Sequence, residues 1–239
     1  MFYNIHYIIE IDLSNFESSD VTITQSMFQD CQGLKSLNLK GFKTNKVLIF
    51  EKMFDTCISL KFLDLSSFET PLVQSFKSMF KYCKALTSLD LSGFVFKSTK
   101  LNMDDMFYGC EKLKYINIKN APEYDYNGDI IGNTPNNLVM CFNKTIASSL
   151  FNILKNKGCA NLDCSNNWKN NQNKIRDSNG DCVPSCIINT NYRLYDYENT
   201  CYENCPEETI KNDDYTCKSI YEIEESKTNE NMQSFLVKK

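Results

Sequence analysis

A phrase of the form Met-Phe-x-x-Cys-x-x-Leu recurs four times in the first half of this 239-residue chain. Its copies begin at Met27, Met53, Met79 and Met106, and each is followed by a short alternating run such as Leu63-Asp64-Leu65. A fifth, partial copy covers residues 8–16. A period near 26 residues with a Leu-x-x-Leu-x-Leu signature is typical of a leucine-rich solenoid. One such unit cannot bury its own apolar face, so the copies are expected to stack.

Each unit combines two patterns. The alternating run predicts a short strand with its leucines pointing inward. The Met-Phe segment has apolar residues at i, i+1, i+4 and i+7, which indicates a helical or turn-like face packed on the strands. The expected fold class is therefore α/β, with a leucine-rich repeat solenoid of short parallel strands plus helical turns. A small disulfide-rich module is expected to follow the solenoid.

The chain divides into four expected regions. Residues 1–120 form the solenoid, 121–158 a connector and capping helix, 159–219 a cysteine-rich module, and 220–239 a polar tail. Ile146, Leu150, Ile153 and Leu154 have helical spacing. They predict a helix over residues 145–157, with Thr145 as its N-cap, that closes the open end of the solenoid core.

The twelve cysteines form two groups. Four keep the repeat spacing and are expected to be buried as small apolar residues rather than paired between neighbouring coils: Cys31, Cys57, Cys83 and Cys110. The other eight are candidate disulfide cysteines: Cys141, Cys159, Cys164, Cys182, Cys186, Cys201, Cys205 and Cys217. Zinc is the alternative ligand, but the Cys-x2-Cys spacing of zinc knuckles is missing and the only histidine is His6. No metal site is predicted, and the disulfide connectivity stays open.

Side chains between the inward leucines are expected to form ladders along one face, because stacked strands lie about 4.8 Å apart. The candidate ligand-binding residues on this face are Phe62, Tyr115, Asp64, Asp90, Asn38 and Asn117. The two aromatic residues are candidate anchors for a ligand. The alternative is a solvated sheet face that is merely regular. A calcium site along the two aspartates is disfavoured, because no loop supplies the six to eight oxygens that calcium takes.

Composition and motifs exclude several classes of function. The formal net charge is −4 and the basic residues do not cluster, which argues against nucleic-acid binding. The sequence has no glycine-rich phosphate loop, no nucleophile elbow, and no histidine base beside a cysteine. We therefore expect neither an enzyme nor a cofactor.

Targeting signals are sparse. The first residues lack the basic and apolar regions of a signal peptide, and no run of eighteen apolar residues occurs. The chain begins inside a repeat without a capping unit, so it is expected to be a fragment of a longer protein that carries the signal and a membrane anchor. Asn143-Lys144-Thr145 is a sequon, which makes Asn143 a candidate glycosylation site.

Residues 79–94, Met-Phe-Lys-Tyr-Cys-Lys-Ala-Leu-Thr-Ser-Leu-Asp-Leu-Ser-Gly-Phe, carry the closest copy of a known motif. It resembles the repeat of BspA-like leucine-rich repeat surface proteins, which occur in bacteria and protists. The likeness covers about half of the chain and implies surface display, adhesion to host or matrix proteins, and no catalytic residues. The trailing cysteine module is similar to Cys-Pro-containing segments of some protist surface proteins.

These patterns together predict a non-enzymatic, extracellular or cell-surface protein that binds a protein or glycan ligand on another cell or matrix through its strand-lined face. One alternative is a structural coat component that self-associates through the open end of the solenoid. Another is an intracellular scaffold whose cysteine module holds zinc.

Overall fold

The computed structural model describes residues 1–97, 101–123, 129–136, 138–155 and 157–161, and shorter stretches beyond them. These stretches are residues 175–176, 179–183, 187–189, 192–193, 195–197, 200–202, 205, 209–211 and 217–219. The chain forms two compact units, Met1–Asn171 and Gln172–Lys239.

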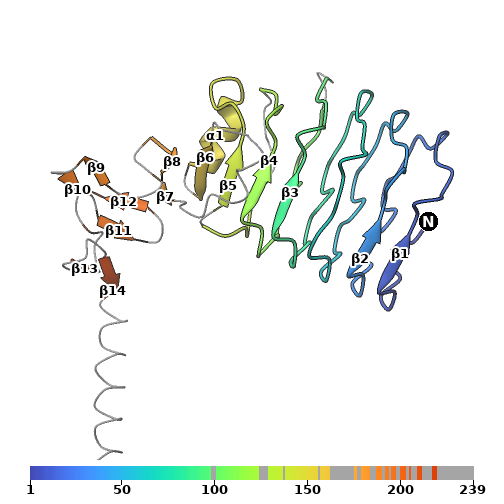
Figure 1. Cartoon of the computed structure of the whole chain (residues 1–239), viewed down its shortest axis with the longest axis horizontal. Coiled ribbons are helices and arrows are strands. Elements are labelled where there is room, and N and C mark those ends of the chain that lie inside the picture. The colour runs from blue at the N-terminus through green and yellow to red at the C-terminus, as the bar shows by residue number, and fades with distance from the viewer. Residues whose placement is uncertain are drawn as a thin grey trace, which may run out of the picture. The chain divides into compact units, whose positions relative to one another are not determined.

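The first unit is a solenoid whose strands lie side by side from β1 to β6 (Figure 1). These strands are β1 (Glu10–Asp12), β2 (Ser36–Asn38), β3 (Ser88–Asp90), β4 (Tyr115–Asn117), β5 (Leu138–Cys141) and β6 (Gly158–Asn161). All of their pairings are parallel: β1 pairs with β2, and β3 to β6 form one four-stranded sheet. The predicted parallel-strand solenoid is therefore confirmed.

Five coils make up the repeats, and we number them 1 to 5 from their Met-Phe pairs at residues 1, 27, 53, 79 and 106. Coil 1 includes Met1-Phe2, which the sequence pattern missed because Ile5 stands where the other copies have cysteine. The Phe2 ring nevertheless stacks on Phe28, with ring centroids 5.5 Å apart and planes 3° apart. Asn4 also has the same left-handed φ of 62° as its counterpart Asp30.

The Met-Phe segments are turns, so of the two conformations that their spacing allows, helical or turn-like, the structure has the second. In coil 3, Lys52 and Thr56 flank the segment with φ values of 56° and 62°. Left-handed residues interrupt a right-handed helix at once. The N–H groups that a helix would use internally instead donate to the next coil, as when the Phe54 N–H donates to the Met79 carbonyl at 2.9 Å. The turns therefore link neighbouring coils by hydrogen bonds, whereas a helix would use the same N–H groups within one coil.

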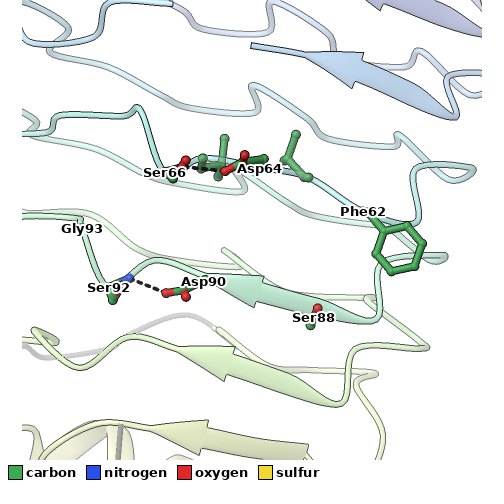
Figure 2. Close-up of a pocket in the computed structure, with 9 residues that line it drawn as sticks. Phe62, Asp64, Ser66, Ser88, Asp90, Ser92 and Gly93 are labelled. Carbon is green, nitrogen blue, oxygen red and sulfur yellow. Dashed lines mark hydrogen bonds between the residues drawn. The ribbon is translucent and has the colours of Figure 1, made fainter. Parts of the chain in front are cut away.

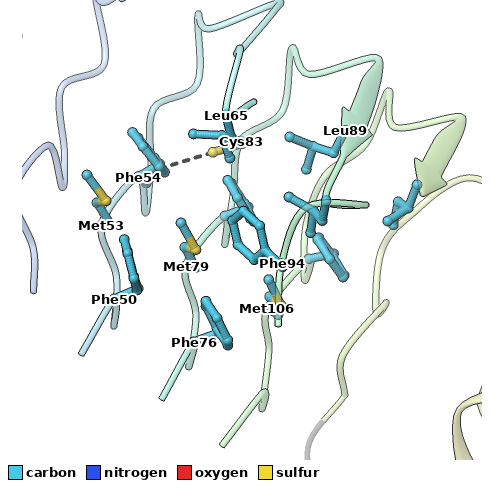
Figure 3. Packing of buried hydrophobic residues seen from close by; sticks show 14 of the residues in the cluster. Phe50, Met53, Phe54, Leu65, Phe76, Met79, Cys83, Leu89, Phe94 and Met106 are labelled. Atoms are coloured by element: carbon cyan, nitrogen blue, oxygen red, sulfur yellow. Dashed lines mark hydrogen bonds between the residues drawn. The ribbon is translucent and has the colours of Figure 1, made fainter. Parts of the chain in front are cut away.

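The solenoid core consists of apolar side chains stacked coil upon coil (Figure 3). Its longest stack joins one phenylalanine from every coil, with successive centroids 5.5–5.9 Å apart: Phe2, Phe28, Phe54, Phe80 and Phe107. A second stack runs through Phe16, Phe42, Phe68 and Phe94. Offset and near-parallel rings at this spacing add to the free energy of burial. The core therefore grows with every coil.

The four repeat cysteines are free thiols buried in this core, as expected. Each thiol donates to the carbonyl of the Met-Phe phenylalanine in the preceding coil; Figure 3 marks the bond from Cys83 Sγ to the Phe54 carbonyl at 3.0 Å. Burial raises the pKa of Cys110 to about 12. A buried thiol with an acceptor is held in its protonated form, so these cysteines act as small apolar residues with one hydrogen bond each.

The sheet continues past the expected boundaries at residues 120 and 158, because β5 and β6 extend it beyond the repeats.

The helix between β5 and β6, α1 (Ser148–Leu154), is shorter than predicted. Its first N–H groups are not capped by Thr145. They donate to the Glu123 carboxylate, for example from Ser148 N at 2.6 Å. The Ser149 and Ser148 donors lower the pKa of Glu123. Leu150 and Leu154 of α1 join the core, as the predicted closure requires.

The described residues of the second unit form short strands. They are β7 (Ile175–Arg176), β8 (Cys182–Val183), β9 (Ile187–Asn189), β10 (Tyr192–Arg193), β11 (Tyr195–Tyr197), β12 (Thr200–Tyr202), β13 (Thr209–Lys211) and β14 (Cys217–Ser219). A disulfide links Cys205 to Cys217. Across the described parts of the chain, no helix has the length and apolar composition needed to cross a bilayer.

Candidate functional site

The strand-lined face carries most of the predicted ligand-binding residues. Asn38, Asp64 and Asp90 are exposed on it, on coils 2, 3 and 4. Asn117 is the exception: it lies in β4, which pairs with β3 on one side and β5 on the other, its residual exposure is 3%, and its side chain is not available to a ligand. The prediction of a binding role for Asn117 is corrected on this ground.

The regular Asp and Asn ladder has a local structural cause. In each coil the Oδ1 atom accepts the backbone N–H two residues later, at 2.8–3.3 Å, and so closes a turn after the strand. Asp and Asn favour such turns because their side chains reach the nearby backbone. The Ser14 N–H lowers the pKa of Asp12 in this way. The repetition of these residues thus serves the fold before any ligand is considered.

The two candidate aromatic anchors differ in exposure. Phe62 on coil 3 is 71% exposed, whereas Tyr115 in β4 is half-buried. Phe62 occupies the ladder position that holds Glu10, Ser36 and Ser88 in coils 1, 2 and 4. Coil 5 has Tyr115 at this position, so the exposed phenylalanine ring distinguishes coil 3 from its two neighbours, which have serine there.

Coil 3 also interrupts the strand ladder. Residues 62–64 form no strand in the structure, although the alternating pattern predicts one, so β2 and β3 are not joined by strand pairing. The coil stays in place through its other contacts. Its turn hydrogen-bonds to coil 4, with Thr56 N–H donating to the Lys81 carbonyl at 2.8 Å, and Phe54 stacks on both neighbouring rings.

A hollow of about 570 Å³ lies on the face at this interruption. Figure 2 shows Phe62 at one end, Ser66, Ser92 and Gly93 at the other, and the two aspartates between them. The described residues that line it are Phe62, Leu63, Asp64, Leu65, Ser66, Ser88, Asp90, Ser92 and Gly93. This volume falls within the range of small-ligand sites in proteins. The structure thus brings Phe62, Asp64 and Asp90 together in one place and leaves Asn38 and Tyr115 outside it.

The lining of the hollow is acidic. Its described residues include two carboxylates and no basic side chain. Within the described residues, no three His, Cys, Asp or Glu side chains converge in a way that would hold a metal ion. The lining residues can interact with a ligand through hydrogen bonds, charge and apolar contact.

A ladder of buried hydroxyl side chains is not evident from the apolar repeat pattern. Ser18, Thr44 and Thr70 recur every 26 residues and are buried. The Thr44 hydroxyl donates to the Glu69 carbonyl at 2.8 Å and accepts the Glu69 N–H at 2.8 Å. Aligning the units beyond their apolar positions would have revealed this spacing. These hydroxyls join neighbouring coils and do not face the hollow.

Disulfide formation is confirmed for five of the eight late cysteines: Cys141, Cys159, Cys182, Cys205 and Cys217. Cys164, Cys186 and the side chain of Cys201 lie outside the described residues. Asn143 is exposed, and its Oδ1 accepts both the N–H and the hydroxyl of Thr145, at 3.0 and 2.7 Å. Its glycosylation stays a prediction.

Comparison with known proteins places the repeats in a family. No curated protein and no solved structure matches the chain. A family model described as "Mycoplasma protein of unknown function, DUF285" matches residues 1–120, which are the coils described above. The solenoid therefore carries the family signature, and the chain belongs to the DUF285 family.

Proposed function

We propose that this protein is a non-enzymatic binding protein of the cell surface or extracellular space, which recognises a protein or glycan ligand through its strand-lined face. The observation that carries the proposal is the hollow between coils 3 and 4, with the exposed Phe62 ring at its end. Repeat proteins commonly bind ligands on such extended faces. An exposed aromatic side chain beside a concave site is a typical interface anchor.

The cysteines support the proposed location. Disulfides such as Cys205–Cys217 persist in oxidising environments and are rare in the cytosol. Cysteines held in disulfides are also unavailable as zinc ligands, so the zinc-holding scaffold is not proposed. The likeness of residues 79–94 to BspA-like leucine-rich repeat surface proteins supports the same assignment, including adhesion as the biological role.

Binding by the full chain to an array of extracellular-matrix proteins and glycans tests the proposal. Phe62→Ser removes the ring at the hollow, and Leu72→Ser is the matched control, since Leu72 is 52% exposed and lies outside the lining. We expect Phe62→Ser to lose most of the binding and Leu72→Ser to keep it, with both variants retaining the far-ultraviolet circular dichroism of the parent. Equal binding by Phe62→Ser would remove the hollow as the site.

Self-association is the second candidate function, and one observation favours it. Alternate residues of coil 1 are exposed and apolar: Met1, Tyr3, Ile5, Tyr7 and Ile9. Glu10 and Asp12 on β1 oppose symmetric pairing of that strand with itself, because like charges across a strand pair repel. Sedimentation at rising protein concentration separates this candidate from the first, since only a coat component would assemble without a ligand.

A further inference from the structure

We propose that the hollow between coils 3 and 4 receives the cationic side chain of an arginine or lysine from a basic segment of a partner protein. This inference rests on the proposed function and names the chemistry of the ligand. Its basis is the combination of one concave site, two carboxylates and one exposed ring (Figure 2).

Charge is the first argument. Asp64 and Asp90 are exposed side chains on neighbouring coils, and both line the hollow, whereas no basic residue does. The turn hydrogen bonds from Ser66 N–H and Ser92 N–H, at 2.9 and 3.0 Å, hold each carboxylate in place. A cation entering between them meets two oriented carboxylates, and preorganised groups lower the entropic cost of binding. An anionic ligand would be repelled by the same pair.

The ladders of the five coils supply the second argument. Coils 2 and 5 combine an amide with a lysine, Asn38 with Lys40 and Asn117 with Lys119. Coils 3 and 4 combine a carboxylate with a serine at the same two positions. At both positions the residues of coils 3 and 4 are more negative than those of coils 2 and 5. Coils 3 and 4 are the coils that border the hollow. Coil 1 has the same pair, Asp12 with Ser14, but does not line the hollow, so coils 3 and 4 are where this acidic combination meets a concave site.

Shape and apolar contact supply the third argument. Leu65 is 4% exposed at the lining, and Phe62 presents a free ring at one end. Arginine and lysine carry aliphatic stems that pack on apolar surface while their charged heads stay at polar groups. A cation near the face of an aromatic ring gains further stabilisation. A neutral sugar would pack on Phe62 equally well but would gain little from two like charges.

Fluorescence anisotropy with the full chain tests this assignment on three probes. They are a short labelled Ser-Arg repeat peptide, the same peptide with Gln in place of each Arg, and a labelled neutral chito-oligosaccharide. The test variant is Asp64→Asn with Asp90→Asn. It preserves the turn acceptors, because Asn38 and Asn117 make the same turns in the native chain. The matched control is Asp12→Asn, on the same ladder in coil 1 and outside the hollow.

We expect the arginine peptide to bind and the glutamine peptide to bind about tenfold more weakly, the size expected for two partly exposed charge pairs. The double variant should lose about tenfold, Asp12→Asn should match the parent, and added salt should weaken binding. Oligosaccharide binding that needs Phe62 but not the carboxylates would overturn the cation assignment and leave the proposed face intact. Failure of the arginine peptide to bind, or an equal loss in Asp12→Asn, would also overturn it.

Discussion

The repeat coils and the second unit of this protein use the same residue in opposite ways. In the five coils, four cysteines stay as buried free thiols among stacked phenylalanines, and the disulfide-bonded Cys141 and Cys159 of the first unit come after them, in β5 and β6. In the second unit, where strands are two or three residues long, Cys205 is crosslinked to Cys217. Stacked coils bury more apolar surface with each repeat, so their core needs no crosslink. Short strands bury little, and a disulfide compensates by restricting the unfolded chain. Three predictions test this contrast.

The largest effect is expected in the phenylalanine stack. Phe54→Ala removes a fully buried ring that contacts rings on both sides, and should lower the free energy of unfolding by about 3–5 kcal/mol. Urea denaturation followed by circular dichroism measures this loss. Phe62→Ala, at a 71% exposed ring in the same coil, is the control and should stay within about 0.5 kcal/mol of the parent. Equal losses would show that the stack does not stabilise the solenoid.

The next effect belongs to the second unit. Replacing Cys205 and Cys217 together by serine opens a loop with a sequence separation of 12. The opening free energy of the β13–β14 pair should fall by about 3 kcal/mol, measured by hydrogen exchange at the amides of β13. Cys83→Ser, which removes no crosslink, should leave exchange in β13 unchanged. Undiminished protection after the double replacement would contradict the role given to the disulfide.

The smallest effect, taken per thiol and per pH unit, is a pH dependence of the solenoid's stability. Burial raises the pKa of Cys110 from 9.0 to about 12 and raises that of Cys83 well above its ordinary value. Below the ordinary value both states hold the proton, so the stability is fully present. Above it only the unfolded chain loses the proton, and stability falls by about 1.4 kcal/mol per pH unit per thiol.

Urea denaturation at several pH values between about 9 and 11 measures this slope, since the ordinary thiol pKa marks its start. Cys83→Ala removes one of the four thiols, so its slope should be shallower than that of the parent by the contribution of one group. Identical slopes would mean that Cys83 is not held protonated in the folded solenoid. The crosslinked cysteines do not titrate and contribute nothing to the difference.

Much of the solenoid was predictable because its determinants are local and repeated. Leu39, Leu65 and Leu91 are buried as the alternation requires, and the repeat cysteines are free. The start of coil 1 was harder to predict, because Ile5 in the cysteine position hides its Met1-Phe2 pair. The choice between a helical and a turn-like Met-Phe segment could not be made from the sequence, because apolar residues at i, i+1, i+4 and i+7 fit either conformation. Only φ values such as that of Thr56 separate the two.

The candidate site was predictable only in part. Phe62, Asp64 and Asp90 were selected as outward residues on a strand face, and they do lie together. The same rule predicts that Asn117 faces the solvent, but Asn117 is buried in β4, next to the strand β5 that extends the sheet beyond the repeats. The cap of α1 could not be predicted from the sequence either, because Glu123 is 25 residues from Ser148 in the chain.

The sequence by itself determined the period, the inward face and the separate uses of the two cysteine groups. These follow from residue spacing, which each coil repeats without reference to distant parts of the chain. The tertiary structure alone decided that the strand ladder is interrupted at residues 62–64 and that a hollow forms there. An alternating run specifies which side chains point outward. Whether the run pairs with its neighbours depends on how the adjacent coils pack, which no single repeat encodes.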